Sequence, residues 1–218
     1  MKKETKKNFG IAAILLGAFV VWTTAVQLVD VQPIGPQGST VGFATVNSWV
    51  HNLTGVHMSL YTVTDWLGLV PIGVATGFAI LGLAQWIRRK RLLQVDRSIL
   101  ALGGFYLAVI AVYVFFEMVA VNYRPVLIDG FLEASYPSST TMLVLCVMPT
   151  AIMQLNARTR NRGIRSCVAF AIAGFTAFMV IGRLVSGVHW LSDIIGGALV
   201  SSGLVMMYHA IGSPASKS

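Results

Sequence analysis

Three ionisable residues lie close together between two apolar runs near the end of the sequence. The stretch GRLVSGVHWLSDIIGG, residues 182–197, places Arg183, His189 and Asp193 where a membrane span ordinarily carries no ionisable group. His189 and Asp193 are four residues apart, so on a helix their side chains share one face. If Asp193 accepts a hydrogen bond from one ring nitrogen of His189, the other nitrogen stays basic and can act as a nucleophile. The spacing therefore predicts a nucleophilic histidine oriented by a carboxylate.

A second group of polar residues precedes this stretch. Arg124 lies in VNYRP, and Ser138 and Ser139 lie in SYPSSTT at the start of a later apolar run. Guanidinium groups are planar, permanently charged donors, and the first amides and hydroxyls of a helix add further donors for an anion. If the three segments converge, Arg124 and Arg183 together with the start of that helix form a pocket suited to a phosphate.

The composition indicates that these residues belong to a membrane protein. The chain has 218 residues, of which 56% are hydrophobic and 11% charged, and its mean hydropathy is +0.74. Since about 20 apolar residues cross a bilayer, this length predicts one all-α domain, residues 1–218, with six transmembrane helices. The segment VGFATVNSWVHNLTG, between spans one and two, has apolar residues at helical spacing and predicts a short interfacial helix. The spans are expected at about 9–29, 59–86, 98–121, 138–155, 166–188 and 190–210.

The charges predict the orientation of the spans. Of the 16 Lys and Arg residues, four lie in the head, five between spans two and three, four between spans four and five, and one in the tail. These 14 fall on one side, which the positive-inside rule makes cytoplasmic, with both termini there. Arg124 and Arg183 lie on the outward side. The excess of positive residues, a net charge of +8, thus reflects the orientation of the spans in the membrane, and no nucleic-acid partner is expected.

In order and spacing, the three segments resemble the three-part signature of the membrane phosphatidic acid phosphatase type 2 superfamily. Its soluble relatives include acid phosphatases and vanadium haloperoxidases. The resemblance covers residues 117–193 directly, through Arg124-Pro125, Tyr136-Pro137-Ser138-Ser139 and Arg183-x5-His189-x3-Asp193. The six-span layout with an outward site extends it across nearly the whole chain.

The resemblance implies a role for each matching residue. His189 would attack phosphorus to form a phosphohistidine, and Asp193 would orient it. Arg124 and Arg183 would hold the phosphate oxygens, with amide or hydroxyl donors from Ser138 and Ser139. No metal and no other cofactor is implied.

The sequence departs from the family pattern at three positions. Glu117 stands where the family usually has a lysine, Thr140 where it has a proton-donating histidine, and Gly182 where it has a serine. Glu117 could form an ion pair with one of the arginines, act as the missing acid, or have an unrelated packing role. A threonine hydroxyl is too weak an acid to replace the histidine.

These departures bear on the substrate. Loss of a general acid costs about 10²- to 10⁴-fold in rate, and the penalty grows as the leaving group becomes poorer. Phosphate expelled from a diphosphate is already a stable anion, whereas an alkoxide is not. The sequence therefore favours a polyprenyl diphosphate, undecaprenyl diphosphate above all, cleaved at the outer face of a bacterial cytoplasmic membrane.

Two other functions are compatible with the same residues. A degenerate or deliberately inactivated family member would bind a lipid phosphate without turnover, since the acid and one cation are missing. A small transporter would hold an anion between helices, although such proteins usually show internal repeats and none is found here.

Overall fold

The computed structural model describes residues 3–212, and within this range the chain forms helices and no β-strand. Short 3₁₀ helices cover Pro36–Gly38 and Leu92–Gln94. The α-helices are α1 (Lys3–Leu28), α2 (Ala44–Thr54), α3 (Met58–Leu67), α4 (Leu69–Arg89), α5 (Arg97–Met118), α6 (Ser139–Arg158), α7 (Arg162–Val185) and α8 (Leu191–Gly212).

Six helical segments in this range are long and apolar enough to cross a membrane, which confirms the predicted number of spans. They are Glu4–Leu28, Met58–Arg89, Arg97–Met118, Ser139–Arg158, Arg162–Val185 and Leu191–Ile211. The second consists of α3 and α4, which meet at Gly68. Because Pro71 has no amide hydrogen, it cannot donate to the carbonyl of Leu67, four residues earlier. The helix is therefore interrupted at Gly68, next to that carbonyl.

The span boundaries differ from the prediction by up to five residues: the first span begins at Glu4 rather than residue 9, and the fifth ends at Val185 rather than residue 188. Two of the differences have identifiable reasons. The third span ends at Met118 rather than residue 121, because the chain bends at Val119 and then enters the loop that leads to Arg124. The fifth begins at Arg162 rather than residue 166, because the side chain of Asn161 caps the helix by accepting a hydrogen bond from the amide of Ile164 at 3.2 Å.

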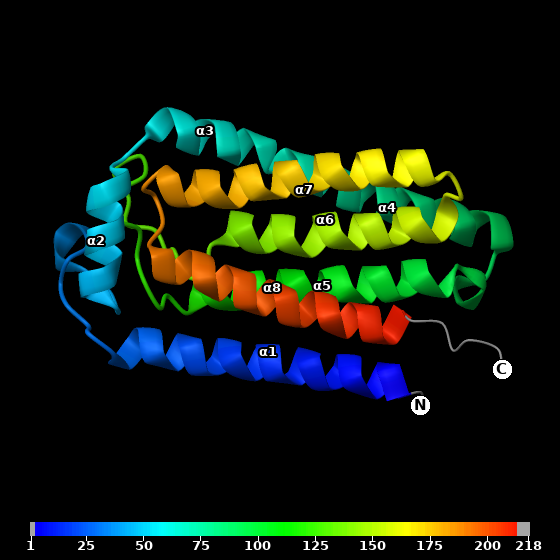
Figure 1. The fold of residues 1–218 in the computed structure, drawn as a ribbon, viewed down its shortest axis with the longest axis horizontal. Coiled ribbons are helices and arrows are strands. Elements are labelled where there is room, and N and C mark those ends of the chain that lie inside the picture. Colours follow the sequence, from blue (N-terminus) through cyan, green and yellow to red (C-terminus); the bar gives the residue numbers. More distant parts are fainter. Residues whose placement is uncertain (1–2, 213–218) are drawn as a thin grey trace.

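The long helices lie side by side along the molecule, and α2 lies across one end (Figure 1). The ends of α1 and α8 that face the chain termini lie at the other end, together with the α4–α5 and α6–α7 connections (Figure 1). Those connections carry the Lys and Arg residues of 88–97 and 158–165. One end of the bundle is therefore strongly cationic, as the charge pattern of the sequence predicts. The α5–α6 loop and the α7–α8 connection lie at the α2 end.

The short helix expected between the first two spans is confirmed as α2. Its exposed residues include Val46, Trp49 and Leu53, an apolar row typical of a helix that lies at a membrane surface. On the opposite side Asn47 is buried and holds the helix in place. Its amide nitrogen donates to the carbonyl of Gly42 at 2.7 Å and to the hydroxyl of Ser192 at 2.9 Å.

Candidate active site

Arg124, Arg183 and His189 converge at the α2 end of the bundle. Arg183 lies in the last turn of α7, His189 in the connection to α8, and Arg124 in the loop between α5 and α6. The Nε2 atom of His189 lies 3.4 Å from Nη1 of Arg124 and 3.3 Å from Nη2 of Arg183. All three side chains are buried, so two guanidinium groups flank one imidazole nitrogen out of contact with bulk water.

The turn between α7 and α8 requires a glycine. Gly187 has a φ of +70°, and a Cβ there would lie 2.0 Å from the carbonyl oxygen of Gly55 in the α2–α3 turn. The amide of His57 donates to the carbonyl of Ser186 at 2.9 Å across the same contact. The segment that carries His189 is therefore held against the α2–α3 turn.

Asp193 faces the other ring nitrogen of His189, although not in the way the spacing predicts. His189 precedes α8 rather than sharing a helix with Asp193, which lies in the first turn of α8. The carboxylate caps its own helix, because its Oδ2 accepts a hydrogen bond from the amide of Trp190 at 3.0 Å. The same Oδ2 lies 3.7 Å from Nδ1 of His189, an ion-pair distance rather than a hydrogen bond. A proton on Nδ1 is thus favoured, which leaves Nε2 unprotonated as the nucleophile.

Burial lowers the pKa of His189 well below its ordinary value, and the neighbouring Arg124 and Arg183 lower it further. Both effects disfavour the imidazolium form. The imidazole is therefore neutral at neutral pH, which is the state that a nucleophile requires.

A buried amide that the sequence reasoning missed holds Asp193. The Nδ2 of Asn122 donates to Oδ1 of Asp193 at 3.1 Å and to the hydroxyl of Ser192 at 3.2 Å. Asn47 of α2 reaches the same serine, since its Oδ1 accepts from the amide of Ser192 at 3.1 Å. In the sequence, only the position of Asn122, two residues before Arg124, could have indicated that it belongs to the site. Nothing in the sequence indicated that Asn47 does.

Each arginine has an acidic partner, but neither partner is Glu117. Arg124 Nε lies 2.9 Å from Oε2 of Glu133, and Arg183 Nη1 lies 3.6 Å from Oδ1 of Asp65. The ring of Tyr61 lies beneath both guanidinium groups, at 5.9 and 4.9 Å. Glu133 reaches Arg124 because residues 123 and 134 pair as an antiparallel bridge across the loop. The ion pair considered for Glu117 is therefore absent from residues 3–212.

The start of α6 borders the site, as the SYPSSTT stretch predicts. Ser138 is the N-cap residue, and its amide already donates to the carbonyl of Asp193 at 3.1 Å, so only its hydroxyl is left for an anion. The first amides of α6, beginning with Ser139, have no partner inside the helix. Close packing on α8 holds this segment, because a Cβ at Gly196 would lie 2.5 Å from the ring of Tyr136.

A narrow cleft lies beside His189, with a cavity volume of about 10 Å³. Its lining includes Glu117 from the last turn of α5 and Ser139 from the first turn of α6. Thr140 does not line this cleft, although the resemblance assigns its position to the proton donor. It lines the neighbouring apolar groove instead.

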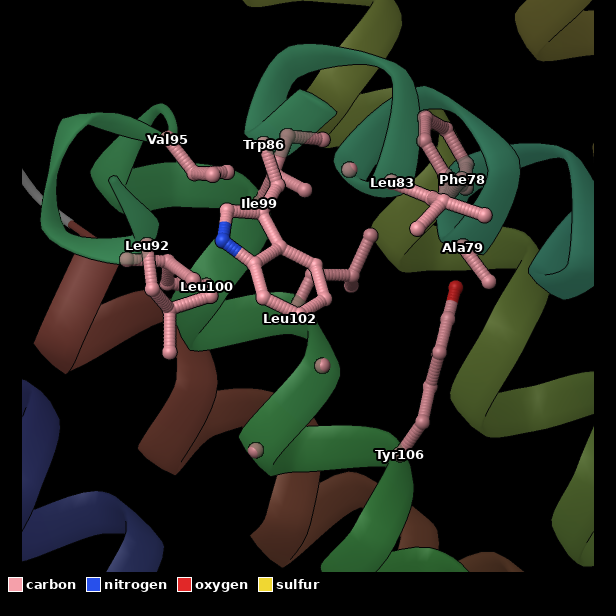
Figure 2. A pocket seen from close by; sticks show the side chains of 13 residues that line it. Phe78, Ala79, Leu83, Trp86, Leu92, Val95, Ile99, Leu100, Leu102 and Tyr106 are labelled. Atoms are coloured by element: carbon pink, nitrogen blue, oxygen red, sulfur yellow. The ribbon is translucent and has the colours of Figure 1, made fainter. Parts of the chain in front are cut away.

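That groove continues from the cleft along α4 and α5. A hollow of about 360 Å³ shares Tyr113 and Ser139 with the cleft, and a second of about 360 Å³ shares Ile110 with the first. A third hollow, also of about 360 Å³, shares Tyr106 with the second. Figure 2 shows this third hollow, which lies between Phe78 and Leu83 of α4 and Leu102 of α5 and is bordered by Trp86 and Leu92.

Comparison with known proteins agrees with the motifs and the fold. Residues 119–215 match the sequence model of the family described as the PAP2 superfamily. The fold is similar to that of a transmembrane PAP2-type phosphatidylglycerolphosphate phosphatase from Bacillus subtilis, with a TM-score of 0.52 and 20% identity over 92% of this chain and 94% of that chain. No curated protein matches the chain. The resemblance of this integral membrane protein to the phosphatidic acid phosphatase type 2 superfamily is therefore confirmed by the family-model match over residues 119–215, and the fold of nearly the whole chain is similar to that of the solved phosphatase.

Proposed function

We propose that this protein is a membrane lipid phosphatase that removes a phosphate from a polyprenyl diphosphate through a phosphohistidine at His189. The observation that carries the proposal is the position of its Nε2 between two buried guanidinium groups. The ring nitrogen faces two cationic donors that bind phosphate oxygens well, and Asp193 lies at the opposite nitrogen.

The reaction follows from these contacts. Arg124 and Arg183 bind the phosphate oxygens, and Nε2 of His189 attacks phosphorus as the bond to the leaving oxygen breaks. The carboxylate of Asp193 stabilises the positive charge that develops on the ring while Nδ1 keeps its proton. Water then cleaves the phosphorus–nitrogen bond, which releases inorganic phosphate and restores His189.

The apolar groove supports a substrate with a long hydrocarbon chain. It runs along α5 from Tyr113, beside the cleft, to Ile99. At the helical rise of 1.5 Å per residue these positions are about 20 Å apart, a large part of the hydrocarbon thickness of a membrane. A chain of several isoprene units would fill that length.

The environment of Thr140 supports a diphosphate as the reacting group. Thr140 lines the groove rather than the cleft at His189, and its hydroxyl is a poor proton donor. A leaving group that is already a stable anion, such as the lipid monophosphate, needs little protonation. The distribution of the cations favours an outward-facing site in a bacterial cytoplasmic membrane, because the cationic end of the bundle would be cytoplasmic.

The test is phosphate release by the purified protein from undecaprenyl diphosphate and, separately, from phosphatidic acid, beside a His189→Ala variant. We expect release from the diphosphate that the substitution abolishes, and slow or no release from phosphatidic acid. Equal rates on both lipids would contradict the leaving-group reasoning. Tight lipid binding without any release would identify a binding protein. Glu117 and Thr140, which replace the usual lysine and histidine, would then explain the lack of turnover.

A further inference from the structure

The cleft beside His189 contains a carboxylate that the reaction above does not use. Glu117 lies in the last turn of α5, is exposed, and lines the cleft together with His189. Within residues 3–212 no cation lies within ion-pair distance of it, and its electrostatic neighbour is Tyr113, one turn earlier on the same helix. Glu117 is therefore an acidic side chain that water can reach and that neither arginine holds.

The second half of the reaction leaves a chemical role unfilled. A good leaving group relieves the need for a general acid when the phosphohistidine forms. It does not help the phosphohistidine to break down, because the attacking group is then water whatever lipid was cleaved. Water attacks phosphorus faster when a base removes its proton. A threonine hydroxyl at position 140 cannot serve as that base.

We propose that Glu117 is the general base that activates water against the phosphohistidine, an inference that rests on the proposed function. The carboxylate takes one proton from a water molecule while the water oxygen bonds to phosphorus. The phosphorus–nitrogen bond breaks, its electron pair returns to Nε2 of His189, and inorganic phosphate leaves. The proton then passes from Glu117 to solvent through the exposed side of the cleft.

The other titratable groups near the cleft do not suit the role of the base. Tyr136 shares a hydrogen bond of 2.7 Å with the hydroxyl of Thr23, and burial raises its pKa. Glu133 is paired with Arg124. Tyr113 is a phenol and a weak general base at neutral pH. Asp193 is fully buried and accepts hydrogen bonds from Asn122 and Trp190.

The experiment compares Glu117→Gln with the wild-type protein in steady-state and rapid-quench measurements on a short polyprenyl diphosphate. Because only the second half-reaction is slowed, kcat should fall by about 10²- to 10⁴-fold while kcat/KM, which reports the first irreversible step, stays within about threefold. A burst of lipid monophosphate equal to the enzyme should appear, and acid-labile phosphohistidine should accumulate. Asp129→Asn is the matched control, because it removes the same charge from an exposed loop residue outside the cleft and should change neither constant.

A second variant tests whether the lost group is a base. Glu117→Asp, which keeps a carboxylate at the edge of the cleft, should retain much of kcat and show no burst. The inference is overturned if Glu117→Gln lowers kcat and kcat/KM together without accumulating phosphohistidine, while His189→Ala still abolishes release. If the wild-type protein releases no phosphate from the diphosphate, the proposed function itself fails, and the role of Glu117 with it.

Discussion

Replacing Asn122 by alanine removes the amide that holds the carboxylate of Asp193 in place. Asn122 is fully buried and touches Asp193 at 3.1 Å, but it makes no contact with His189. A hydrogen bond to a charged group contributes about 1.5 to 3 kcal/mol. If that energy serves to align Asp193 with the imidazole in the transition state, its loss lowers kcat/KM by about 10- to 150-fold, since about 1.4 kcal/mol corresponds to a factor of ten.

The assay is phosphate release from a short polyprenyl diphosphate in detergent, with Asn52→Ala as the control. Asn52 is an exposed asparagine of α2 and should tolerate the change. Because Asn122 acts through Asp193, adding Asn122→Ala to Asp193→Ala should cost nothing further. A loss of less than about twofold in the single variant, or a full additional loss in the double variant, would refute the reasoning.

Two further predictions concern pH and chain length. Since burial and two arginines lower the pKa of His189, its neutral form persists as the pH falls, and the acid limb of kcat/KM against pH should have its midpoint below the unshifted value of 6.5. Replacing Arg124 by glutamine removes one of those cations and should move that limb to higher pH; a limb that stays in place would contradict this account. Gly103 lines the groove, and a Cβ there meets no atom within 4 Å, so Gly103→Phe should fit without strain and fill the third hollow. It should slow hydrolysis of undecaprenyl diphosphate several-fold relative to a three-isoprene diphosphate, whereas equal slowing of both would argue against a chain in that hollow.

Much of the architecture could be predicted because hydropathy and charge are local properties. A run of apolar residues crosses a membrane whatever its neighbours are, so the six spans and the helix at 44–54 followed from composition and periodicity. The boundaries were less accurate where tertiary contacts decide them. Val119 is apolar and suits a helix, yet the chain leaves the helix there and leads to Asn122 and Arg124 in the site.

The candidate site shows the same division. The sequence by itself determined which residue types gather, because Arg124, Arg183, His189 and Asp193 are ionisable groups that an apolar segment would not otherwise carry. Only the tertiary structure decided their partners: Glu133 and Asp65 rather than Glu117 hold the arginines. It also brought Asn122 to Asp193. The physical reason is that hydrogen bonds and ion pairs act over a few ångströms, and only folding sets which residues from distant helices come that close.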